Sequence, residues 1–264
     1  MQYKGAVFFD YDGTLADEKA GIYYPTETTK TALKKLKQNG YMTVLATGRA
    51  KCYVPDTGID FDGYVTSNGA CAEVCGSVIF DDCFSLDGVY ELIEKFEEMN
   101  LYYSLENRDL CYARDKDNGN FTAMLDNFNI PKNIFVNLDK SNIPKTSKML
   151  VVYETHEEFE YLSDYFKGKF AFYEHRKFLS ADVTKQDIVK AVGAKAICEK
   201  YNIPRENIYA FGDGSNDYDI MQYAGHGIAM GFHHKILEKA AEIITDTVEN
   251  EGINKALLRY GLID

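Results

Sequence analysis

The chain has 264 residues, 45% hydrophobic and 27% charged, which is the balance of a soluble globular protein with one large domain or two moderate ones. Its formal net charge of 29 − 41 = −12 argues against nucleic acid and anionic membranes as partners, because its long-range field repels phosphate groups. No apolar run approaches the ~20 residues of a membrane span, and Asp10 and Asp12 interrupt the N-terminal run too early for a signal peptide, so we expect a cytoplasmic protein.

The first eighty residues alternate between strand and helix patterns. The short apolar run at 6–9 predicts a strand that is covered on both faces. Thr26 caps a predicted helix that ends at Asn39, and the next strands follow at 42–46 and 64–66. This rhythm predicts an α/β fold with a doubly wound, mostly parallel, Rossmann-like sheet whose functional loops lie at the carboxyl ends of its strands.

Between about residues 86 and 180 hairpins mix with helices, which predicts a separate α+β unit with an antiparallel sheet. We expect helices at 86–99, 121–128 and 156–166, and strands at 101–105, 110–113, 148–153, 170–173 and 178–183. We interpret residues 85–180 as an insertion into a core made of residues 1–84 and 181–264. No linker composition marks either boundary.

The alternating pattern returns after Thr184. A helix is predicted at 188–201, and short apolar strands are predicted at 208–211, 228–230 and 243–245. These elements complete the sheet of the core.

Two carboxylates, Asp10 and Asp12, come directly after the first strand. Residues i and i+2 of an extended chain point to the same side, so both carboxylates can face one cavity. Gly13 permits the tight turn that follows, and Thr14 can hold that turn by hydrogen bonding. Because two neighbouring carboxylates repel each other unless a cation or a proton intervenes, the pair indicates a metal site.

Other strand and helix ends supply complementary groups. Thr47 and Gly48 follow the second strand, where a hydroxyl and backbone N–H groups can hold phosphoryl oxygens. Asp213 follows the strand at 208–211 as Asp10 follows the first, and it is a hard oxygen donor suited to Mg²⁺. So many carboxylates also need a cationic side chain to offset their charge, which a lysine can supply. Charge alone does not decide which lysine this is. The candidates are Lys185, Lys190 and Lys195.

Five motifs in this order resemble the haloacid dehalogenase-like (HAD) superfamily, specifically its Cof-type sugar-phosphatase branch with a large α/β cap. They are DYDGTL at 10–15, TGR at 47–49, SNG at 67–69, VKAVGAKAI at 189–197 and GDGSNDYDIM at 212–221. In this branch the cap lies between the threonine and lysine motifs, where the insertion falls. The family's lysine opens a K-(G/A)-x-(A/G) helix start, which Lys190 fits better than the other two lysines.

The resemblance implies a Mg²⁺-dependent phosphatase that works through an aspartyl-phosphate. Asp10 is then the nucleophile, and Asp12 first protonates the leaving oxygen and later activates water. Mg²⁺ is held by the Asp10 side chain, the Asp12 carbonyl and the Asp213 side chain. The resemblance assigns the phosphoryl group to Thr47, Gly48, Lys190 and Asn216, and it implies that Asp217 orients Lys190 or a metal-bound water.

The implied substrate is a small phosphorylated metabolite, with a sugar phosphate favoured over a nucleotide or a phosphorylated cofactor. Two alternatives remain: a phosphomutase of the phosphomannomutase type, and a non-catalytic phosphosugar sensor. A pure phosphate acceptor does not need the acid–base group Asp12, which argues against the sensor. We expect a monomer or a weak homodimer.

Several polar features have no assigned role. Candidate substrate contacts in the insertion are Arg108, Tyr112, Arg114, His175 and Arg176. Relatives usually continue the AMG string with Asn-Ala, whereas here Phe232, His233 and His234 follow; we interpret the histidines as surface loop residues. The six cysteines are expected to be reduced thiols because the protein is expected to be cytoplasmic. Cys71 and Cys75 form a C-x3-C pair, but no second pair with metal spacing follows, so we do not expect a zinc site there.

Overall fold

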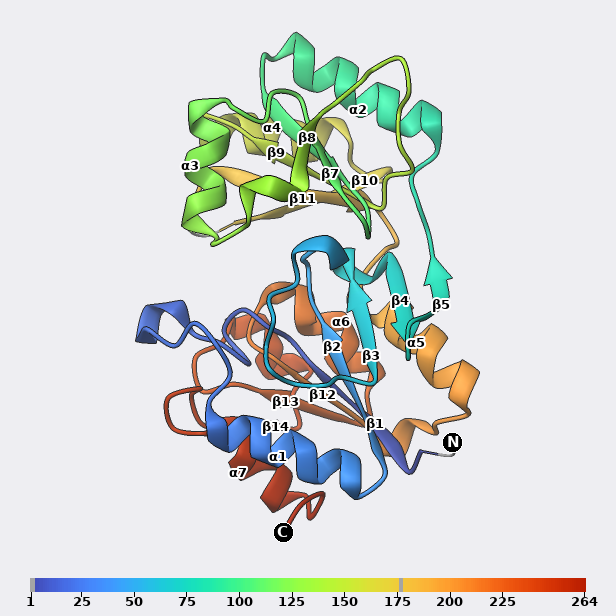
Figure 1. The fold of residues 1–264 in the computed structure, drawn as a ribbon, viewed down its shortest axis with the longest axis vertical. Helices are drawn as coiled ribbons and strands as arrows, with labels where there is room; N and C mark the ends of the chain where they lie inside the picture. The colour runs from blue at the N-terminus through green and yellow to red at the C-terminus, as the bar shows by residue number, and fades with distance from the viewer. Residues whose placement is uncertain (1–2, 176–177) are drawn as a thin grey trace. The chain divides into compact units, whose positions relative to one another are not determined.

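The computed structural model describes residues 3–175 and 178–264, which form two compact units (Figure 1). The first unit contains the chain up to Gly48, Pro55–Phe80 and Val189–Asp264, and the second contains Arg49–Val54 and Asp81–Ile188. These limits differ from those expected at 84/85 and 180/181. Strand β11 (Ser180–Lys185) lies wholly in the second unit because it pairs with two strands there. No sequence signal marked Arg49–Val54 as part of that unit.

An eight-stranded sheet in the order β14-β13-β12-β1-β2-β3-β4-β5 forms the first unit. The pairs from β14 to β3 are parallel and the β3–β4 pair is antiparallel, so the predicted α/β, mostly parallel fold is confirmed. The strands are β1 (Gly5–Phe9), β2 (Tyr41–Ala46), β3 (Gly63–Thr66), β4 (Cys71–Val74), β5 (Ser77–Asp81), β12 (Ile208–Gly212), β13 (His226–Ala229) and β14 (Ile243–Ile244).

Helices cover this sheet on both faces (Figure 1). Helices α5 (Lys190–Tyr201) and α6 (Tyr218–Tyr223) pack apolar side chains such as Ile197 against Phe8 in the main core. Helices α1 (Glu27–Gln38) and α7 (Gly252–Arg259) contact each other, and α1 lies against β2. A strand between two helical layers has no polar face, which explains why every residue of β1 is buried.

Local signals account for the predicted elements. The Thr26 hydroxyl caps α1 by accepting a hydrogen bond from the Thr29 N–H, and the helix buries Leu33 and Leu36 on one side.

Strands β4 and β5 and helices α6 and α7 were not predicted from the sequence. The two strands are short and lie at one edge of the sheet. Short 3₁₀ helices join the elements: η1 (Glu18–Ala20), η2 (Lys51–Tyr53), η3 (Ser67–Gly69), η4 (Lys132–Ile134), η5 (Arg205–Asn207), η6 (Ser215–Asp217) and η7 (Lys235–Lys239).

The second unit is built on a six-stranded sheet in the order β10-β11-β9-β6-β7-β8. Its pairs are antiparallel except for the parallel pair β7–β8, so the predicted antiparallel sheet is confirmed apart from that pair. The remaining strands are β6 (Tyr102–Glu106), β7 (Cys111–Ala113), β8 (Phe135–Asn137), β9 (Lys148–Val152) and β10 (Phe170–Glu174), and the helices are α2 (Leu86–Glu98), α3 (Gly119–Asn127) and α4 (His156–Tyr165).

The two faces of the second sheet differ in character. Side chains such as Tyr103 and Val151 pack with the apolar sides of α2 and α4. On the other face Leu150 and Val152 pack with α3, and the same strands carry polar residues there. One of these, Glu106, lies directly opposite Lys148 of the neighbouring strand.

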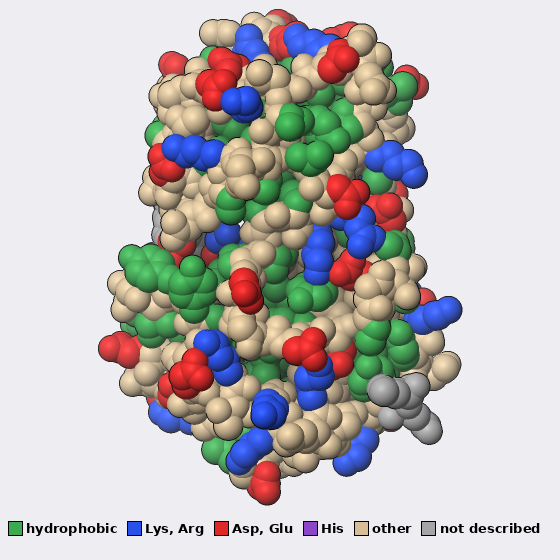
Figure 2. Space-filling model, viewed as in Figure 1, with side chains coloured by type: hydrophobic (Ala, Val, Ile, Leu, Met, Phe, Trp, Pro, Cys, Tyr) green, Lys and Arg blue, Asp and Glu red, His purple; other side chains and the backbone are tan. Residues whose placement is uncertain are grey.

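In the part of the chain that the structure describes, no helix combines the length and the apolar character needed to cross a bilayer. On the face shown in Figure 2, acidic and basic side chains are interspersed.

Candidate active site

The strand register of the first unit brings three predicted motifs to one edge of its sheet. Phe9 lies opposite Leu45 of β2 and Phe211 of β12, so the residues after these strands emerge side by side. The Asp10 N–H continues this pairing by donating to the Phe211 carbonyl at 3.0 Å. Asp10 is therefore held between the Thr47 and Asp213 loops, at the edge where open α/β sheets bind ligands.

The turn after Asp10 is tight because Gly13 is glycine. The Tyr11 carbonyl accepts from the backbone N–H groups of the next residues in the turn, and Gly13 itself has φ of +94°. A Cβ at Gly13 would lie 2.3 Å from the Asp213 carboxylate. The Thr14 hydroxyl donates to the same carboxylate at 3.4 Å. The turn is thus shaped to let Asp213 approach closely.

Lys190 is the first residue of α5 and is fully buried. Its Nζ donates to Asp10 Oδ1 and to Asp217 Oδ1, at 2.6 Å in each case. The helix start can reach this position because Gly69, with φ of +105°, lies against Val189, and a Cβ on Gly69 would be only 2.1 Å from the Val189 carbonyl oxygen. Lys190 therefore joins the strand-end acids rather than solvent.

Asp217 organises the loop after β12. Its Oδ2 accepts from the backbone N–H groups of Asp213 and Gly214, at 3.0 and 2.9 Å, while its Oδ1 binds Lys190. Both oxygens of this buried carboxylate are thus engaged. Asp213 is half-buried, and its own carboxylate receives the Thr14 hydroxyl.

The cluster carries more negative charge than Lys190 offsets. Burial, followed by repulsion from Asp217, raises the pKa of Asp10 to about 7 despite the attraction of Lys190. Burial and repulsion from Asp10 and Asp217 raise the pKa of Asp213 to about 8. Asp12 is exposed and adds to the repulsion on both. A further cation would relieve this repulsion.

The donor set fits Mg²⁺. One carboxylate oxygen from each of Asp10, Asp213 and Asp217 lies within 4.8 Å of the other two. Hard oxygen donors, few in number and supplemented by water and substrate, are what Mg²⁺ takes in proteins. Because Asp217 is engaged by Lys190 and the loop N–H groups, Asp10 and Asp213 are the side chains suited to hold the ion.

The predicted phosphate-binding residues lie around this cluster. Thr47 is buried at the end of β2, and its N–H donates to the Val65 carbonyl at 2.8 Å. The Asn216 amide donates to Asn68 Oδ1 at 3.1 Å, and the Asn68 N–H donates to the Thr47 carbonyl at 3.3 Å. A chain of hydrogen bonds thus connects the Asn216 loop to Thr47. Gly48 follows, half-buried.

Asn68, the asparagine of the SNG string, has no role predicted from the sequence. Asn68 is buried, with φ of +53°, a left-handed conformation that asparagine tolerates better than most residues. That backbone geometry, which spacing alone does not reveal, turns its side chain toward Asn216.

The other two candidate lysines lie elsewhere. Lys185 pairs with Asp82 in the second unit, at 2.6 Å, and Lys195 is exposed on α5, 3.8 Å from Glu199. Lys190 is the candidate that contacts the acids.

The loop after the AMG string carries Phe232, His233 and His234. Phe232 is exposed, His233 Nδ1 lies 2.7 Å from the Met230 carbonyl oxygen, and the exposed His234 caps η7.

The residues of the insertion that are candidate substrate contacts differ in their surroundings. Arg114 donates to the Leu101 carbonyl at 2.8 Å and lies over the Tyr102 ring, so it braces the strands. Tyr112 packs with the core beneath α2 and α4. Arg108 is half-buried, and His175 lies 3.4 Å from Asp182. Arg176 lies outside the described residues.

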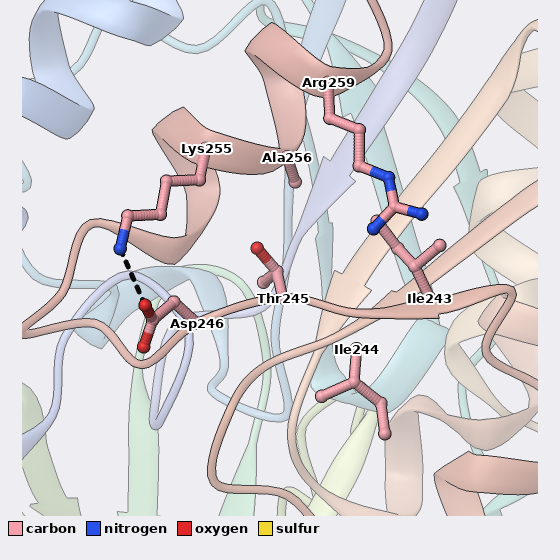
Figure 3. Close-up of a pocket in the computed structure, with 7 residues that line it drawn as sticks. All are labelled: Ile243, Ile244, Thr245, Asp246, Lys255, Ala256 and Arg259. Carbon is pink, nitrogen blue, oxygen red and sulfur yellow. Dashed lines mark hydrogen bonds and ion pairs between the residues drawn. The ribbon is translucent and has the colours of Figure 1, made fainter.

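A pocket of about 300 Å³ lies between β14, the loop after it and α7 (Figure 3). Lys255 on α7 reaches back to Asp246 at 2.6 Å, and Ile244 lies at the sheet edge. None of the residues that line this pocket belongs to the predicted site. They are Ile243, Ile244, Thr245, Asp246, Lys255, Ala256 and Arg259.

Comparison with known proteins places these features in a family. The family model described as haloacid dehalogenase-like hydrolase matches residues 7–257. A putative bifunctional phosphatase/peptidyl-prolyl cis-trans isomerase of Streptococcus pyogenes is 30% identical over 98% of the chain, and the chain spans 54% of that relative's length. The 5-amino-6-(5-phospho-D-ribitylamino)uracil phosphatase YitU of Bacillus subtilis is 27% identical over 96% of each chain.

Solved structures show the same architecture. The HAD subclass IIB sugar phosphatase BT4131 superposes with a TM-score of 0.85 at 25% identity, over 98% of this chain and 100% of its own. The phosphatase BT1666 of Bacteroides thetaiotaomicron superposes with a TM-score of 0.84 at 25% identity, over 99% of this chain and 96% of its own.

Proposed function

The chain belongs to the haloacid dehalogenase-like hydrolase family, as a phosphatase of its Cof-type branch, and we propose that it is a Mg²⁺-dependent enzyme that hydrolyses a small phosphorylated metabolite through an aspartyl-phosphate. The observation that carries the proposal is the Lys190 ammonium between Asp10 and Asp217, with the Asp213 carboxylate close to both. A nucleophile, a counter-charge and a metal-binding carboxylate thus share one sheet edge.

Asp10 is the nucleophile in this proposal. Its side chain is nearly buried and one of its oxygens, Oδ1, is fixed by Lys190, which leaves a rigid carboxylate to attack phosphorus in line. Asp12, two residues on and exposed, first gives a proton to the leaving oxygen and then takes one from the water that hydrolyses the aspartyl-phosphate.

Lys190, Thr47, Gly48 and Asn216 surround the phosphoryl group in the same proposal. Their N–H and O–H donors and the ammonium stabilise the charge that spreads over the phosphoryl oxygens in the transition state. Asp217 holds the Lys190 ammonium in place and closes the Asp213 loop. Mg²⁺, held by Asp10, the Asp12 carbonyl and Asp213, supplies positive charge beside the phosphoryl group and lowers the repulsion among the acids.

The substrate class rests on the relatives. BT4131 is named a sugar phosphatase and YitU a phosphatase of a phosphoribityl compound, so the proposed substrate is a phosphorylated sugar or sugar alcohol derivative. A screen of phosphorylated metabolites with Mg²⁺, scored by release of inorganic phosphate, tests this directly. Asp10→Asn is the matched control, and substrate-dependent turnover in that variant contradicts the mechanism.

The same screen separates hydrolysis from phosphoryl return to the sugar. A phosphatase releases inorganic phosphate in proportion to substrate lost, whereas a phosphomutase gives an isomeric sugar phosphate with none released. A chain that binds sugar phosphates and does neither acts as a sensor, which would reject the proposal.

A further inference from the structure

The segment Arg49–Val54 is embedded in the second unit, although the chain on both sides of it belongs to the first. Ala50 and Tyr53 are buried in an apolar cluster with α3. The Tyr53 hydroxyl donates to Glu106 at 2.6 Å, and an Arg49 N–H donates to the Phe128 carbonyl at 3.5 Å. Because Gly48 connects this segment directly to Thr47, whatever restrains it also restrains the strand end that carries Thr47.

Two thiols meet at this segment. Cys52 lies in η2, and Cys111 is the first residue of β7, 59 positions later in the chain. Their sulfur atoms are 3.6 Å apart, and both residues belong to the second unit. A disulfide has its sulfurs about 2.05 Å apart, so an approach of roughly 1.5 Å would close the bond.

The two cysteines differ in accessibility. Cys111 has no exposed surface, whereas Cys52 is half-buried and also contacts the Asn107 carbonyl through its sulfur, at 3.4 Å. Burial raises the pKa of the Cys111 thiol, which therefore stays protonated. The half-buried thiol is thus the one that a small oxidant meets first, and the buried thiol is placed to resolve the product.

We propose that Cys52 and Cys111 are a modification site that forms a reversible disulfide when the protein meets a small peroxide. The Cys52 sulfur attacks one peroxide oxygen and the O–O bond breaks. The Cys52 thiol proton joins the departing hydroxide, so one water leaves as Cys52 becomes a sulfenic acid. The Cys111 sulfur then attacks the Cys52 sulfur, its proton joins the departing hydroxide, and a second water leaves. Two thiols are oxidised, one peroxide is reduced, and a dithiol reverses the change.

The bond joins the Arg49–Val54 segment covalently to β7, which restrains the chain leaving Thr47. The kcat of an enzyme commonly changes when the residues that connect its structural units gain or lose freedom of movement. We therefore expect oxidation to lower kcat roughly twofold or more, and dithiothreitol to restore it. This kinetic consequence rests on the proposed phosphatase function; the disulfide itself does not.

The test treats the full chain with hydrogen peroxide, quenches it, unfolds the protein in denaturant and alkylates the remaining thiols, so that burial protects none of them. We expect two of the six cysteines to escape alkylation, and a peptide map without reductant to link the peptides of Cys52 and Cys111. Cys52→Ser should abolish the linked peptide, and Cys75→Ser, at an exposed cysteine, should leave it intact. Cys111→Ala provides a second variant that removes the bond.

Outcomes separate the two proposals. A linkage between other cysteines, or none at all, overturns the modification site whatever the activity. A linked pair with unchanged kcat in an active enzyme overturns its regulatory consequence. An inactive reduced protein that still forms the linked peptide counts against the phosphatase function and supports the site.

Discussion

Two buried lysines, one in each unit, invite comparison. Lys190 in the first unit has no exposed surface and binds Asp10 and Asp217, each at 2.6 Å. Lys148 in the second unit is 2% exposed and binds Asp182 at 2.6 Å and Glu106 at 3.0 Å. Each is a buried ammonium between two carboxylates, yet the surroundings give the two clusters opposite electrostatic character.

The Lys148 cluster is satisfied, in the sense that hydrogen-bond donors and positive charge keep its acids ionised. Glu106 accepts from the Ser104 and Tyr53 hydroxyls as well as from Lys148, and the Tyr53 hydroxyl also accepts from Lys148 at 2.8 Å. Burial alone would raise the pKa of Asp182, but Lys148 and His175 outweigh it and hold that pKa well below its usual range. The ionised form is therefore the stable one here.

The Lys190 cluster is not satisfied. The pKa values of Asp10 and Asp213 rise to about 7 and about 8, because burial and mutual repulsion exceed what one lysine offsets. Raised pKa values of this kind mark a candidate functional site, and here they favour the proposed metal ion. The comparison teaches that a buried ion pair alone indicates nothing about function, whereas buried carboxylates whose pKa values stay raised beside a lysine do.

The largest expected effect is on turnover after Asp10→Asn. Removing the proposed nucleophile should lower kcat on the order of 10⁴-fold or more. The same change removes one of the mutually repelling carboxylates, so the melting temperature of the metal-free protein should hold or rise. Activity assays and thermal unfolding check both parts. A large fall in melting temperature would show that the acids stabilise the fold, as they do around Lys148.

Lys190→Ala should come next, with a loss of activity on the order of 10³-fold, because in the proposed mechanism the ammonium faces the charge that develops on the phosphoryl group. Lys195→Ala, on the same helix but exposed, is the matched control and should leave kcat near the wild-type value. Millimolar Mg²⁺ should restore stability to Lys190→Ala without restoring turnover. Equal losses in the two variants would contradict the assignment of Lys190.

In the satisfied cluster the corresponding change acts on stability. Lys148→Met leaves Glu106 and Asp182 buried without their counter-charge, and it should lower the free energy of unfolding by about 3 to 5 kcal/mol. Urea unfolding measures this. The matched control is Lys185→Met, whose ammonium is half-exposed beside Asp82, with an expected cost below about 1 kcal/mol. A stable Lys148→Met variant would mean that solvent reaches the two acids.

The strand-end acids were predictable from the sequence because each follows a short, continuously apolar run. Asp10 and Asp213 are the first residues after β1 and β12, and neighbouring parallel strands bring their carboxyl ends together. The choice of Lys190 came from the motif at its helix start; charge counting had left three lysines equal. The doubly wound core and the hairpins of the second unit followed from periodicity in the same way.

The Lys148 cluster and the Arg49–Val54 segment were not predictable. Glu106, Lys148 and Asp182 come from three strands, and each is an ordinary polar residue on an alternating strand until the sheet order is known. Nothing in the sequence around Tyr53 shows that its hydroxyl enters that cluster. Both features depend on contacts between residues that are distant in the sequence, and local sequence patterns do not reveal such contacts.

The Lys190 cluster and the Lys148 cluster should make the stability of the protein depend on pH in opposite directions. The folded state holds protons on Asp10 and Asp213 more tightly than the unfolded state does, so these groups make the metal-free protein less stable as pH rises from about 4 to about 8. Mg²⁺ competes with those protons.

Stabilisation by Mg²⁺ should therefore be larger at pH 8.5 than at pH 6, reaching about 2.7 kcal/mol when its concentration is 100 times Kd. Thermal unfolding with and without Mg²⁺ at both pH values tests this, and Asp213→Asn should remove the difference. Asp182, whose pKa is lowered, contributes stability that is present above its unfolded pKa and is lost only in acid. A Mg²⁺ effect that is independent of pH would sever the link between the raised pKa values and the metal.

The smallest effect should come from the loop beside the unsatisfied cluster. His234 touches the Asp213 region through its backbone N–H, which donates to the Asp213 carbonyl at 2.7 Å, while its ring accepts from the Ile236 N–H and caps η7. His234→Ala should therefore cost about 0.5 to 1 kcal/mol of stability through the lost cap and change kcat less than about twofold. His234→Pro is the informative partner, because φ at this position is −72°, which proline accepts, and proline removes the N–H. We expect the proline variant to lose more activity than the alanine variant, and a reversed order would indicate that the imidazole itself serves the site.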